Sequence, residues 1–567
     1  MHDYVIVGGG SAGSVLASRL SADPRRQVLL IEAGEDTPPG AVPAPILDSF
    51  PGKAFLNPRF VWTDLRVTTE AIGHNRPGER PRLRKYEQAR VLGGGSSVNG
   101  QLANRGLPAD YEEWVARGAA AWGWDDVLPY FRKLEDDRDF DGPLHGKGGP
   151  IGVRRIFREQ WAEHAKVYSD VLSRHGLPYL PDQNGCFDDG HFPVPISNVD
   201  DQRVTAAMGY LTANVRRRPN LRILTDTHVT GLLFDGLRCV GVTAMSGGQE
   251  QEFRAAEVIL SCGAIHSPAL LLRAGIGPAA ALRDLGIPVL ADLPGVGQRL
   301  MDHPSIAVAS FIKPAARING RSARHIFLVL RFSSGMPGMP GGDMGATLSS
   351  KSAWHAVGDQ IGTMNMWVNK TFSEAGQVRL STRDWRAHPD VDFNLLSDQR
   401  DCDRLMAAFR RFAVLHALPE LEAVTTDAFA ASYSDKVRAV GEMTARNRIT
   451  TAILARLLDG PAALRHKLID SLIVEGVSIE TLLRDDDALE AFVRRAAVGV
   501  WHASCTCRMG ADDDPMAVTD SQGRVREVAG LRVVDASIFP VVPRANTNFP
   551  VLMVAEKIAD TILSESA

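Results

Sequence analysis

The stretch DYVIVGGGSAGSVLASRLSADPRRQVLLIEAG, residues 3–34, decides the fold class of this chain. A short apolar run leads into a glycine turn, a segment with helical spacing follows, and a second apolar run ends at Glu32. The order strand, turn, helix, strand within about thirty residues predicts a compact βαβ unit. Because the two strands of such a unit are parallel, the stretch favours an α/β fold.

The glycine turn of this unit carries the pattern G-x-G-x-x-G at Gly8, Gly10 and Gly13. The first glycine permits the tight turn, the second lets a pyrophosphate approach the backbone, and the third lets the helix pack closely on the strand. Ser11 and Ala12 open the helix, whose N-terminus attracts phosphates. We therefore expect these five residues to hold the diphosphate of a dinucleotide.

Glu32 and Ala33 follow the second strand, where a dinucleotide places its adenosine ribose. The Glu32 carboxylate is placed to accept hydrogen bonds from the ribose hydroxyls. It also disfavours a ribose that carries a 2′-phosphate, because two negative charges would meet. The pattern thus leaves NAD and FAD as the candidate cofactors.

Composition excludes several classes of protein. The chain has 567 residues with a net charge of −4, and its 44% hydrophobic and 23% charged content is ordinary for globular proteins. The tight basic run Arg216–Arg218 is interpreted as a solvated helix end, so no nucleic-acid partner is expected. No apolar run reaches the roughly 20 residues of a membrane span, and no secretory leader precedes the first strand. Six scattered cysteines suit a reduced, cytoplasmic protein.

The remaining chain alternates between glycine-rich turns and helical stretches. Residues 109–137 have helical spacing with three tryptophans, and residues 203–217 predict one helix. From 305 to 495 the sequence pattern predicts longer helices, and 446–495 is mostly helical by pattern. The Met/Gly/Pro-rich loop at 333–345 is interpreted as a mobile surface segment, with a lid as the alternative.

Near the C-terminus, VWHASCTCRMG (residues 500–510) crowds His502, Cys505 and Cys507 together. Zinc needs about four ligands at suitable spacing, and this pattern supplies three in an unusual order with no further Cys or His nearby to complete them. We therefore expect no metal. The alternatives for His502 are a catalytic base and a satisfied core residue.

Four further stretches carry a family resemblance: ARVLGGGSSVNGQLANRG (89–106), GAIHSPALLLRAGIG (263–277), PGVGQRLMDHP (294–304) and GLRVVDASIFPVVPRANTNFPVLMVAEKIAD (530–560). Together with the N-terminal unit they resemble the signature segments of the glucose-methanol-choline (GMC) oxidoreductases, flavoenzymes that oxidise alcohols. The resemblance covers nearly the whole chain in family order. The two central signatures match through Arg90, Gly93, Gly94, Ser96 and Asn99, and through Gly263, Ser267, Pro268, Gly275 and Gly277.

The resemblance implies a Rossmann-like FAD-binding domain interwoven with an α+β substrate-binding domain of antiparallel sheet and helices. The implied division has five parts. FAD binding falls to 1–154, 203–309 and 496–567, the last part also carrying the catalytic residues. The substrate side comprises an excursion at 155–202 and the main domain at 310–495.

The resemblance also implies an extended FAD, with its adenine end at Glu32 and its isoalloxazine ring toward Asn99 and Gly100. Val229 matches the position whose backbone contacts adenine. The other matched positions lie near the ribityl-pyrophosphate (Asp535, Ala536) and beside the flavin ring (Asn546, Thr547). Some relatives tether FAD through a histidine in the serine-rich segment, but SSVNG (96–100) contains none. Non-covalent FAD is therefore expected.

His502 matches the catalytic histidine of the family, and Asn546 matches its partner. Oxidation of an alcohol removes the hydroxyl proton and a hydride from carbon, so a base near the working pH is needed. Histidine, with an unperturbed pKa of about 6.5, suits that role. The resemblance assigns His502 as the base and Asn546 as the hydrogen-bonding partner that orients the alkoxide.

Within the family, the chain is most similar to the bacterial furfural and hydroxymethylfurfural oxidases. That resemblance implies oxidation of furanic and aryl alcohols, and of hydrated aldehydes, with O₂ reduced to H₂O₂. The alternatives are a dehydrogenase that passes electrons to a quinone or other acceptor, and a hydroxynitrile lyase. Substrate-side candidates are Val500, Trp501, Met366, Trp367 and Asn369, and ordinary core packing is the alternative for the last three. No oligomeric state is predicted.

Two positions depart from the family pattern. Gly100 stands where many relatives carry a bulkier side chain, so a larger or more open pocket is expected there. Cys505 stands where relatives usually have glycine. Because only glycine adopts positive φ freely, a cysteine would be strained if the turn required that conformation. We expect instead that the position tolerates a Cβ.

Overall fold

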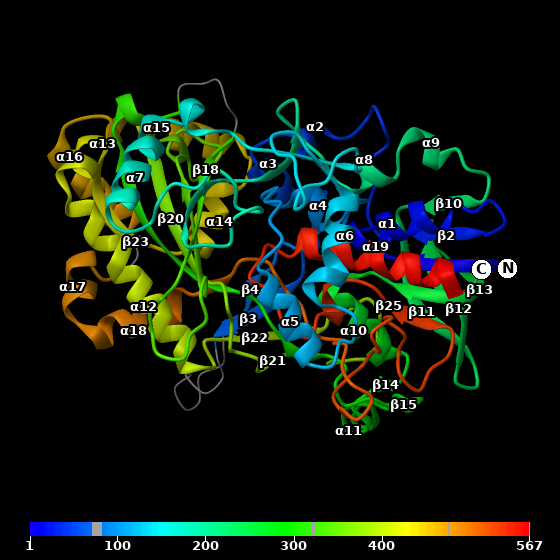
Figure 1. Cartoon of the computed structure of the whole chain (residues 1–567). Coiled ribbons are helices and arrows are strands. Elements are labelled where there is room, and N and C mark those ends of the chain that lie inside the picture. Colours follow the sequence, from blue (N-terminus) through cyan, green and yellow to red (C-terminus); the bar gives the residue numbers. More distant parts are fainter. Residues whose placement is uncertain (71–81, 319–323, 475, 566–567) are drawn as a thin grey trace.

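The computed structural model describes residues 1–70, 82–318, 324–474 and 476–565. The predicted βαβ unit is present as β1 (His2–Val7), α1 (Ser11–Leu20) and β2 (Val28–Ile31). Parallel pairing continues on both sides of β1 and β2, through β13 (Gln249–Leu260), β10 (Leu221–Leu224) and β25 (Leu531–Val533). This sheet lies at the right of Figure 1. The predicted α/β class, with a Rossmann-like parallel sheet, is confirmed.

The parallel sheet is buried because apolar helices cover it. The middle strands consist of side chains with almost no exposure, as expected of a sheet covered on both faces. The C-terminal helix α19 (Asn548–Glu565) packs on α1, and Figure 1 shows both beside the parallel sheet. The carboxyl ends of β1 and β13 therefore meet the start of α19 at one edge of the sheet.

Beyond the parallel part, β13 continues into an antiparallel meander. It pairs with β12 (Arg238–Ser246), which pairs with β11 (Thr227–Asp235). Val229 lies near the start of β11, close to the end of β2. This meander forms one flank of the cofactor domain.

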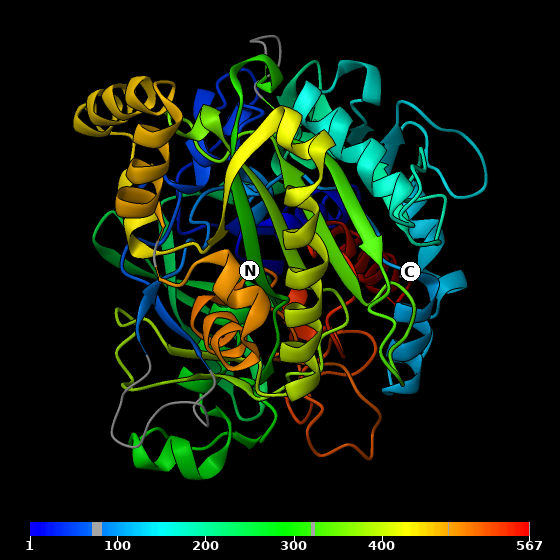
Figure 2. The ribbon, with the colours of Figure 1, turned by 90° about the vertical axis from the view of Figure 1, so that its left-hand side faces the viewer.

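The substrate side is built on a second, antiparallel sheet. Its strands are β7 (Gly190–Pro193), β17 (Pro304–Ile312), β18 (Ile326–Phe332), β19 (Met344–Ser349), β20 (Ile361–Val368), β23 (Thr425–Ala431) and β24 (Val498–Gly499). Helix α12 (Gln399–Ala413) packs against β17 and β20, and Figure 2 shows it crossing the sheet. The expected antiparallel sheet with helices is confirmed.

Two features bear on the five-part division of the chain. Strand β7 comes from the predicted 155–202 excursion and joins the substrate sheet beside β18. The predicted boundary at 309/310 falls inside β17, so the change of sheet comes earlier in the chain. The domain division itself stays a prediction.

A third sheet lies between the two main ones. Its strands are β3 (Arg66–Glu70), β4 (Arg84–Lys85), β16 (Gln298–Leu300), β21 (Gly376–Arg379) and β22 (Asp390–Leu395). It joins segments that the sequence assigns to both domains. The two domains are thus interwoven through shared strands rather than joined by one linker.

The helices follow the predicted pattern with one correction. The stretch 203–217 is two short helices, α8 (Ala206–Tyr210) and α9 (Ala213–Arg216), instead of one. Thr205 and Thr212 each accept a hydrogen bond from a main-chain N–H two to three residues onward, so each starts a new helix. The other main helices are α5 (Pro108–Ala116), α6 (Trp124–Leu134), α7 (Glu163–Arg174), α10 (Gly263–Arg273), α14 (Asp435–Gly441), α15 (Ala445–Leu458), α16 (Ala462–Leu468), α17 (Ile479–Arg484) and α18 (Asp486–Ala496).

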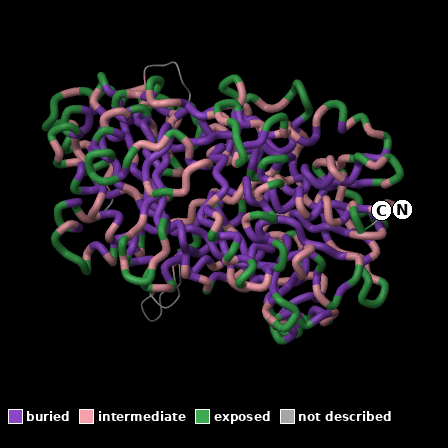
Figure 3. Tube along the Cα trace, in the orientation of Figure 1, coloured by how far each residue is buried: buried purple, intermediate pink, exposed green. Residues whose placement is uncertain are grey.

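Buried segments run through both regions, as Figure 3 shows, and their apolar side chains form two separate large clusters. Trp114 and Trp122 are fully buried and donate their indole N–H groups to the carbonyls of Val541 and Ser521. These bonds satisfy the polar atom of each ring while the apolar part packs. Within the described ranges, no helix is both long and apolar enough to cross a membrane.

Candidate active site

A cavity of about 490 Å³ runs from the first glycine turn to the C-terminal histidine. The ends of β1, β2 and β13, the starts of α1 and α10, and the loop before α19 all contribute to its wall. Concave sites where several strand ends converge are the usual ligand sites of α/β proteins. The cavity is therefore the candidate active site.

The glycines at one end form a cradle that a Cβ would fill. Gly8 has φ +97°, and a Cβ there would lie 2.5 Å from the Ser261 carbonyl oxygen. A Cβ on Gly13 would lie 1.9 Å from the carbonyl oxygen of Gly8. A Cβ on Gly94 would lie 2.5 Å from the Cα of Gly10, so the two glycine turns touch through their backbones. This arrangement fits a diphosphate at the N-terminus of α1.

Glu32 also shapes the cradle. Its carboxylate accepts hydrogen bonds from the main-chain N–H groups of Gly9 and Gly34, both at 2.8 Å. Burial raises its pKa, and these two bonds oppose that rise. Glu32 lines the same cavity as Val229, which fits an adenosine between them. It holds the glycine turn in place as well as facing the expected ribose.

Most of the predicted cofactor residues reach this cavity. Those that line it are Gly8, Gly10, Ser11, Ala12, Glu32, Ala33, Gly94, Asn99, Gly100, Val229, Gly263, Asp535, Ala536, Asn546 and Thr547. Asp535 connects two signature segments, because its carboxylate accepts hydrogen bonds from the Gly263 N–H at 2.9 Å and the Ser267 hydroxyl at 2.6 Å. These residues come from every predicted cofactor segment, so the donor set fits an extended FAD.

Four predicted cofactor residues lie behind the wall instead. Gly13 packs α1 against β1. The Ser96 hydroxyl donates to the Gly93 carbonyl at 2.5 Å and accepts from the Ala206 N–H at 2.9 Å, so both residues brace the second glycine turn. Arg90 donates to the Ala33 carbonyl at 3.1 Å and stacks on Trp62. The structure supports these four as braces of the wall, and direct contact with the cofactor stays a prediction for them.

His502 and Asn546 meet at the opposite end of the cavity. The Nδ2 atom of Asn546 lies 3.1 Å from Nε2 of His502, although the residues are 44 positions apart. His502 follows β24, and Asn546 lies in the loop before α19. Burial lowers the pKa of His502 to about 3, so the imidazole is neutral and able to accept a proton at physiological pH.

Two residues that the sequence did not single out lie directly behind His502. His303 Nδ1 lies 2.8 Å from His502 Nδ1. The Asp302 carboxylate accepts hydrogen bonds from the main-chain N–H groups of His303, Val500 and His502, at 2.7, 3.1 and 3.0 Å. Burial raises the pKa of Asp302 to about 7. Both residues lie in the signature segment PGVGQRLMDHP (294–304). That segment was the sequence signal that could have pointed to them, although no role was assigned to its residues.

Asn104 is a third residue that sequence reasoning missed. It accepts the main-chain N–H of Asn546 at 2.8 Å through Oδ1, and its Nδ2 donates to the side-chain oxygen of Asn546 at 3.0 Å. The two asparagines thus form a closed pair of hydrogen bonds. Asn104 lies in the first signature segment, close to the matched residue Asn99.

The substrate end has an aromatic wall. Val500 and Trp501 line the cavity as predicted, and 37% of Trp501 is exposed. The indole packs against Phe55, Tyr86 and Tyr433, with ring centroids 6.3, 6.4 and 5.4 Å away. Phe55, Tyr86 and Trp501 give the cavity an aromatic side next to His502, and Tyr433 supports Trp501 from outside the lining.

Met366, Trp367 and Asn369 do not reach this cavity, so the structure does not support the substrate-side role expected of them. All three are buried at the end of β20 or just after it. The Trp367 indole donates to the Asn369 side chain at 3.2 Å, and Asn369 donates to the Gly342 carbonyl at 3.2 Å. β20 is an inner strand of a sheet covered by α12, so both of its faces are packed. Core packing is the reading that the geometry supports. No residue of the 333–345 loop lines the cavity either.

The two departures from the family pattern have different outcomes. Cys505 has φ +75°, so the expectation that its backbone avoids the glycine-type conformation was wrong. The turn is pinned by the hydrogen bond from the Cys505 N–H to the Ala536 carbonyl at 3.1 Å. A Cβ on Gly100 would lie 3.2 Å from Cδ1 of Leu102. Gly100 therefore leaves space at the cavity wall that a side chain would occupy.

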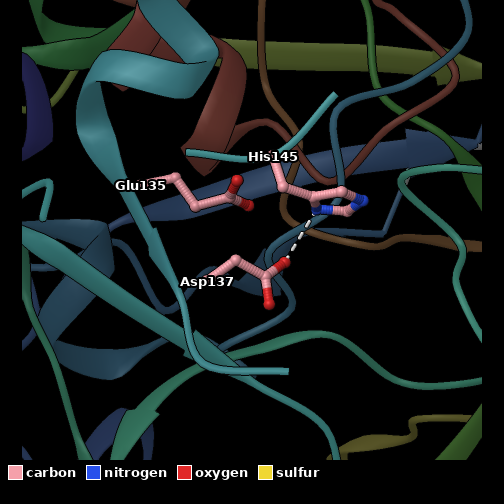
Figure 4. Close-up of side chains that lie close together, drawn as sticks. All are labelled: Glu135, Asp137 and His145. Atoms are coloured by element: carbon pink, nitrogen blue, oxygen red, sulfur yellow. Dashed lines mark hydrogen bonds and ion pairs between the residues drawn. The ribbon is translucent and has the colours of Figure 1, made fainter. Parts of the chain in front are cut away.

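The cysteines next to His502 take no part in a metal cluster among the described residues. The group there with metal-like spacing is Glu135, Asp137 and His145, which Figure 4 shows. His145 Nδ1 lies 2.9 Å from Asp137 and its Nε2 lies 2.8 Å from Asp182. The guanidinium groups of two buried arginines neutralise this cluster, Arg155 at Asp137 and Arg105 at Glu135. Arginines fill the positions that a cation would take, so the cluster is an ion network.

Comparison with known proteins identifies the family. The N-terminal and C-terminal GMC oxidoreductase domains match residues 2–305 and 372–555. The chain belongs to the GMC oxidoreductase family. As a GMC oxidoreductase it is an FAD-dependent enzyme. That the glycine cradle and Glu32 contact this cofactor stays a prediction. The predicted family and the predicted FAD are confirmed.

Among relatives of this GMC oxidoreductase, 5-(hydroxymethyl)furfural oxidase of Methylovorus sp. (strain MP688) is 44% identical over 576 residues, covering 100% of this chain and 99% of that protein. The oxygen-dependent choline dehydrogenase of Photobacterium profundum is 30% identical and covers 100% and 93%. Among solved structures, pyridoxine 4-oxidase from Mesorbium loti superposes with a TM-score of 0.80 at 28% identity, covering 100% and 99%.

Proposed function

We propose that this enzyme is an oxidase of primary furanic and aryl alcohols that reduces O₂ to H₂O₂. The observation that carries the proposal is the full-length, 44% identity to a 5-(hydroxymethyl)furfural oxidase. The pairing of His502 with Asn546 beside an aromatic wall supports it. A flat, apolar side suits a furan or benzene ring, while the two polar side chains suit one hydroxyl group.

In this proposal His502 acts as the base. An alcohol oxygen placed against the 3.1 Å pair can donate its proton to Nε2 of His502 and accept a hydrogen bond from Nδ2 of Asn546. The O–H bond breaks, the N–H bond forms on His502, and the negative charge on oxygen is held by the amide. When bound, FAD accepts the hydride from the adjacent carbon and passes the electrons to O₂.

Burial keeps the His502 imidazole in the neutral form that can accept a proton. Because the pKa of His502 is lowered to about 3, almost every molecule carries the neutral imidazole at pH 7. A base with a low pKa accepts a proton less readily. The hydrogen bond from Asn546 therefore has to stabilise the negative charge that develops on the substrate oxygen. The closed pair with Asn104 keeps the Asn546 amide in position for that bond.

The proposal extends to hydrated aldehydes and to non-covalent FAD. A gem-diol presents the same O–H and C–H groups to His502 as a primary alcohol does. For the cofactor, the segment that carries a tethering histidine in some relatives contributes Val98, Asn99 and Gly100 to the cavity wall. None of these side chains forms a covalent bond with flavin.

A dehydrogenase that uses another acceptor is the second candidate. Several relatives at 30–32% identity are oxygen-dependent choline dehydrogenases, so choline is the second substrate to compare. Purified enzyme should therefore be tested with furfuryl, benzyl, cinnamyl and aliphatic alcohols, with choline, and with the corresponding aldehydes. We expect peroxide under air with the furanic and aryl alcohols, and bleaching of the flavin without air. Dye reduction with no peroxide under air would contradict the oxidase, and turnover of choline alone would contradict the substrate class.

A further inference from the structure

The base His502 has a second histidine directly behind it. The two Nδ1 atoms are 2.8 Å apart, and the rings are nearly perpendicular at 88°, with centroids 5.0 Å apart. Both residues are buried. A hydrogen bond between two ring nitrogens needs one proton and one lone pair, so one Nδ1 must be protonated and the other must not.

The asparagine pair shows which nitrogen of His502 carries the proton in this structure. The main-chain N–H of Asn546 can only donate, so the Asn104 atom that it meets is the carbonyl oxygen. The amino group of Asn104 then faces the side-chain oxygen of Asn546. This leaves the Asn546 amino group pointing at Nε2 of His502, and an amino group requires an acceptor there. His502 is therefore protonated at Nδ1 and unprotonated at Nε2.

We propose that His303 is a positioning residue that accepts the Nδ1–H of His502 and thereby keeps Nε2 as the nitrogen that takes the substrate proton. The proposal rests on the proposed function for the identity of the substrate. The tautomer of His502 is a property of the chain alone. No other described side chain is hydrogen-bonded to Nδ1 of His502.

His303 is suited to accept because it is held neutral. Burial and the neighbouring His502 lower its pKa, and the backbone of Pro543 and Asn369 acts in the opposite direction. A neutral imidazole carries one proton, so when Nδ1 of His303 accepts the Nδ1–H of His502, the proton of His303 is on Nε2. Lys370 lies near enough to disfavour further protonation.

Asp302 fixes the relative position of the two histidines through their main chains. It receives the main-chain N–H groups of both His303 and His502, so one carboxylate fixes both peptide segments. It therefore does not act as the acceptor for the His502 ring. A neutral imidazole in that place stabilises an imidazolium less than a carboxylate would. This agrees with the low pKa of His502.

Proton transfer balances without moving a proton onto His303. The substrate O–H bond breaks and an Nε2–H bond forms on His502. The Nδ1–H of His502 stays in place, and its bond to His303 becomes stronger because the donor is now charged. Losing an acceptor for a charged donor costs about 10-fold or more in rate.

The tautomer can be measured without any turnover. The test uses holoenzyme labelled with ¹⁵N in its histidines, and the His502 signals are assigned by comparison with His502→Ala. We expect a protonated Nδ1 and an unprotonated Nε2 at pH 7.5, and a mixture of tautomers in His303→Leu. A wild-type His502 protonated at Nε2, or an unchanged tautomer in His303→Leu, would overturn the proposal.

A kinetic test separates positioning from structure. We expect anaerobic flavin reduction by benzyl alcohol to slow about 10-fold or more in His303→Leu. His303→Asn, whose side-chain oxygen can accept the same proton, should retain most of the rate, and substrate affinity should change little in either. His164→Leu, at another buried histidine, is the matched control for a lost ring. Equal rates in His303→Leu and wild type would contradict the proposal.

The outcomes of these two tests distinguish a wrong role for His303 from a wrong proposed function. If wild-type enzyme reduces its flavin with none of the alcohols, the substrate assignment is wrong, and the ¹⁵N signals still decide the tautomer. If His303→Leu does not fold, the tautomer of His502 and the rate of flavin reduction are measured in His303→Asn and His303→Gln instead. An Nε2–H tautomer in wild-type holoenzyme would then be sufficient to reject the role of His303.

Discussion

At the residue scale, the site depends on a few side chains whose conformations are tightly constrained. His502 is buried and held between Asn546 and His303. Cys505, three residues later, occupies a left-handed conformation that glycine adopts more easily. Sequence reasoning located both residues, but not the neighbours or the backbone angle that determine what each can do.

Replacing His502 by Ala should leave a yellow protein that no longer reduces its flavin efficiently. Loss of the base lowers the rate of flavin reduction by a factor on the order of 10² or more. FAD binding should survive, because the glycine cradle and Glu32 lie at the other end of the cavity. Stopped-flow absorbance and the FAD content of the purified protein measure the two effects. Near-normal reduction would refute the assignment.

The two buried cysteines of the catalytic turn should respond oppositely to glycine. At Cys505, with φ +75°, glycine relieves strain, so Cys505→Gly should be at least as stable as Cys505→Ala. At Cys507, which has no positive φ, Gly should be less stable than Ala by about 1 kcal/mol. Thermal unfolding of the four variants at a fixed FAD concentration tests this difference. The same order at both positions would show that the backbone angle is not the cause.

At the element scale, short polar networks fix how segments from distant parts of the chain meet. Asp137, at the end of the strand β5 (Glu135–Asp137), pairs with both His145 and Arg155. The Asp137 and Asp182 carboxylates more than offset the burial of His145 and raise its pKa to about 9. This network therefore stabilises a corner of the fold that the hydrophobic pattern alone does not specify.

The contribution of His145 should disappear at high pH. A raised pKa means that the folded state holds a proton that the unfolded state releases near pH 6.5. The stabilisation is fully present below that pH and is lost as pH rises through about 9. His145→Gln should therefore lower the free energy of unfolding more at pH 6 than at pH 10. Urea denaturation at both values checks this, and an equal cost at both would argue against a charged His145.

At the scale of the whole molecule, buried histidines set the acid limit of stability. Of the fourteen histidines within the described ranges, eleven have a lowered pKa, and burial is the leading cause in each. They are distributed over both domains. Protonation therefore acts on the fold as a whole instead of on one site.

Stability should fall as pH decreases below about 6.5, before most unfolded carboxylates titrate. In that range histidines of the unfolded state bind protons, whereas the buried histidines of the folded state stay neutral. The free energy of unfolding therefore decreases as the pH falls. Acids with a raised pKa act in the opposite direction, but these six groups are fewer than the eleven histidines: Asp302, Glu32, Glu87, Asp139, Asp401 and Asp535. Denaturation midpoints between pH 7.5 and 5, at constant FAD, measure the slope. A flat profile would contradict this account.

The sequence by itself determined the α/β class, the glycine cradle, the cofactor and the candidate base, because each depends on residues close together in the chain or in a recognisable order. Only the tertiary structure decided what surrounds the base. His303 is 199 positions from His502, and Asn104 is 442 positions from Asn546. Such contacts form only where the ends of the sheets pack together. The same packing buried Met366, Trp367 and Asn369 away from the cavity, although the family resemblance had suggested that they line the substrate side.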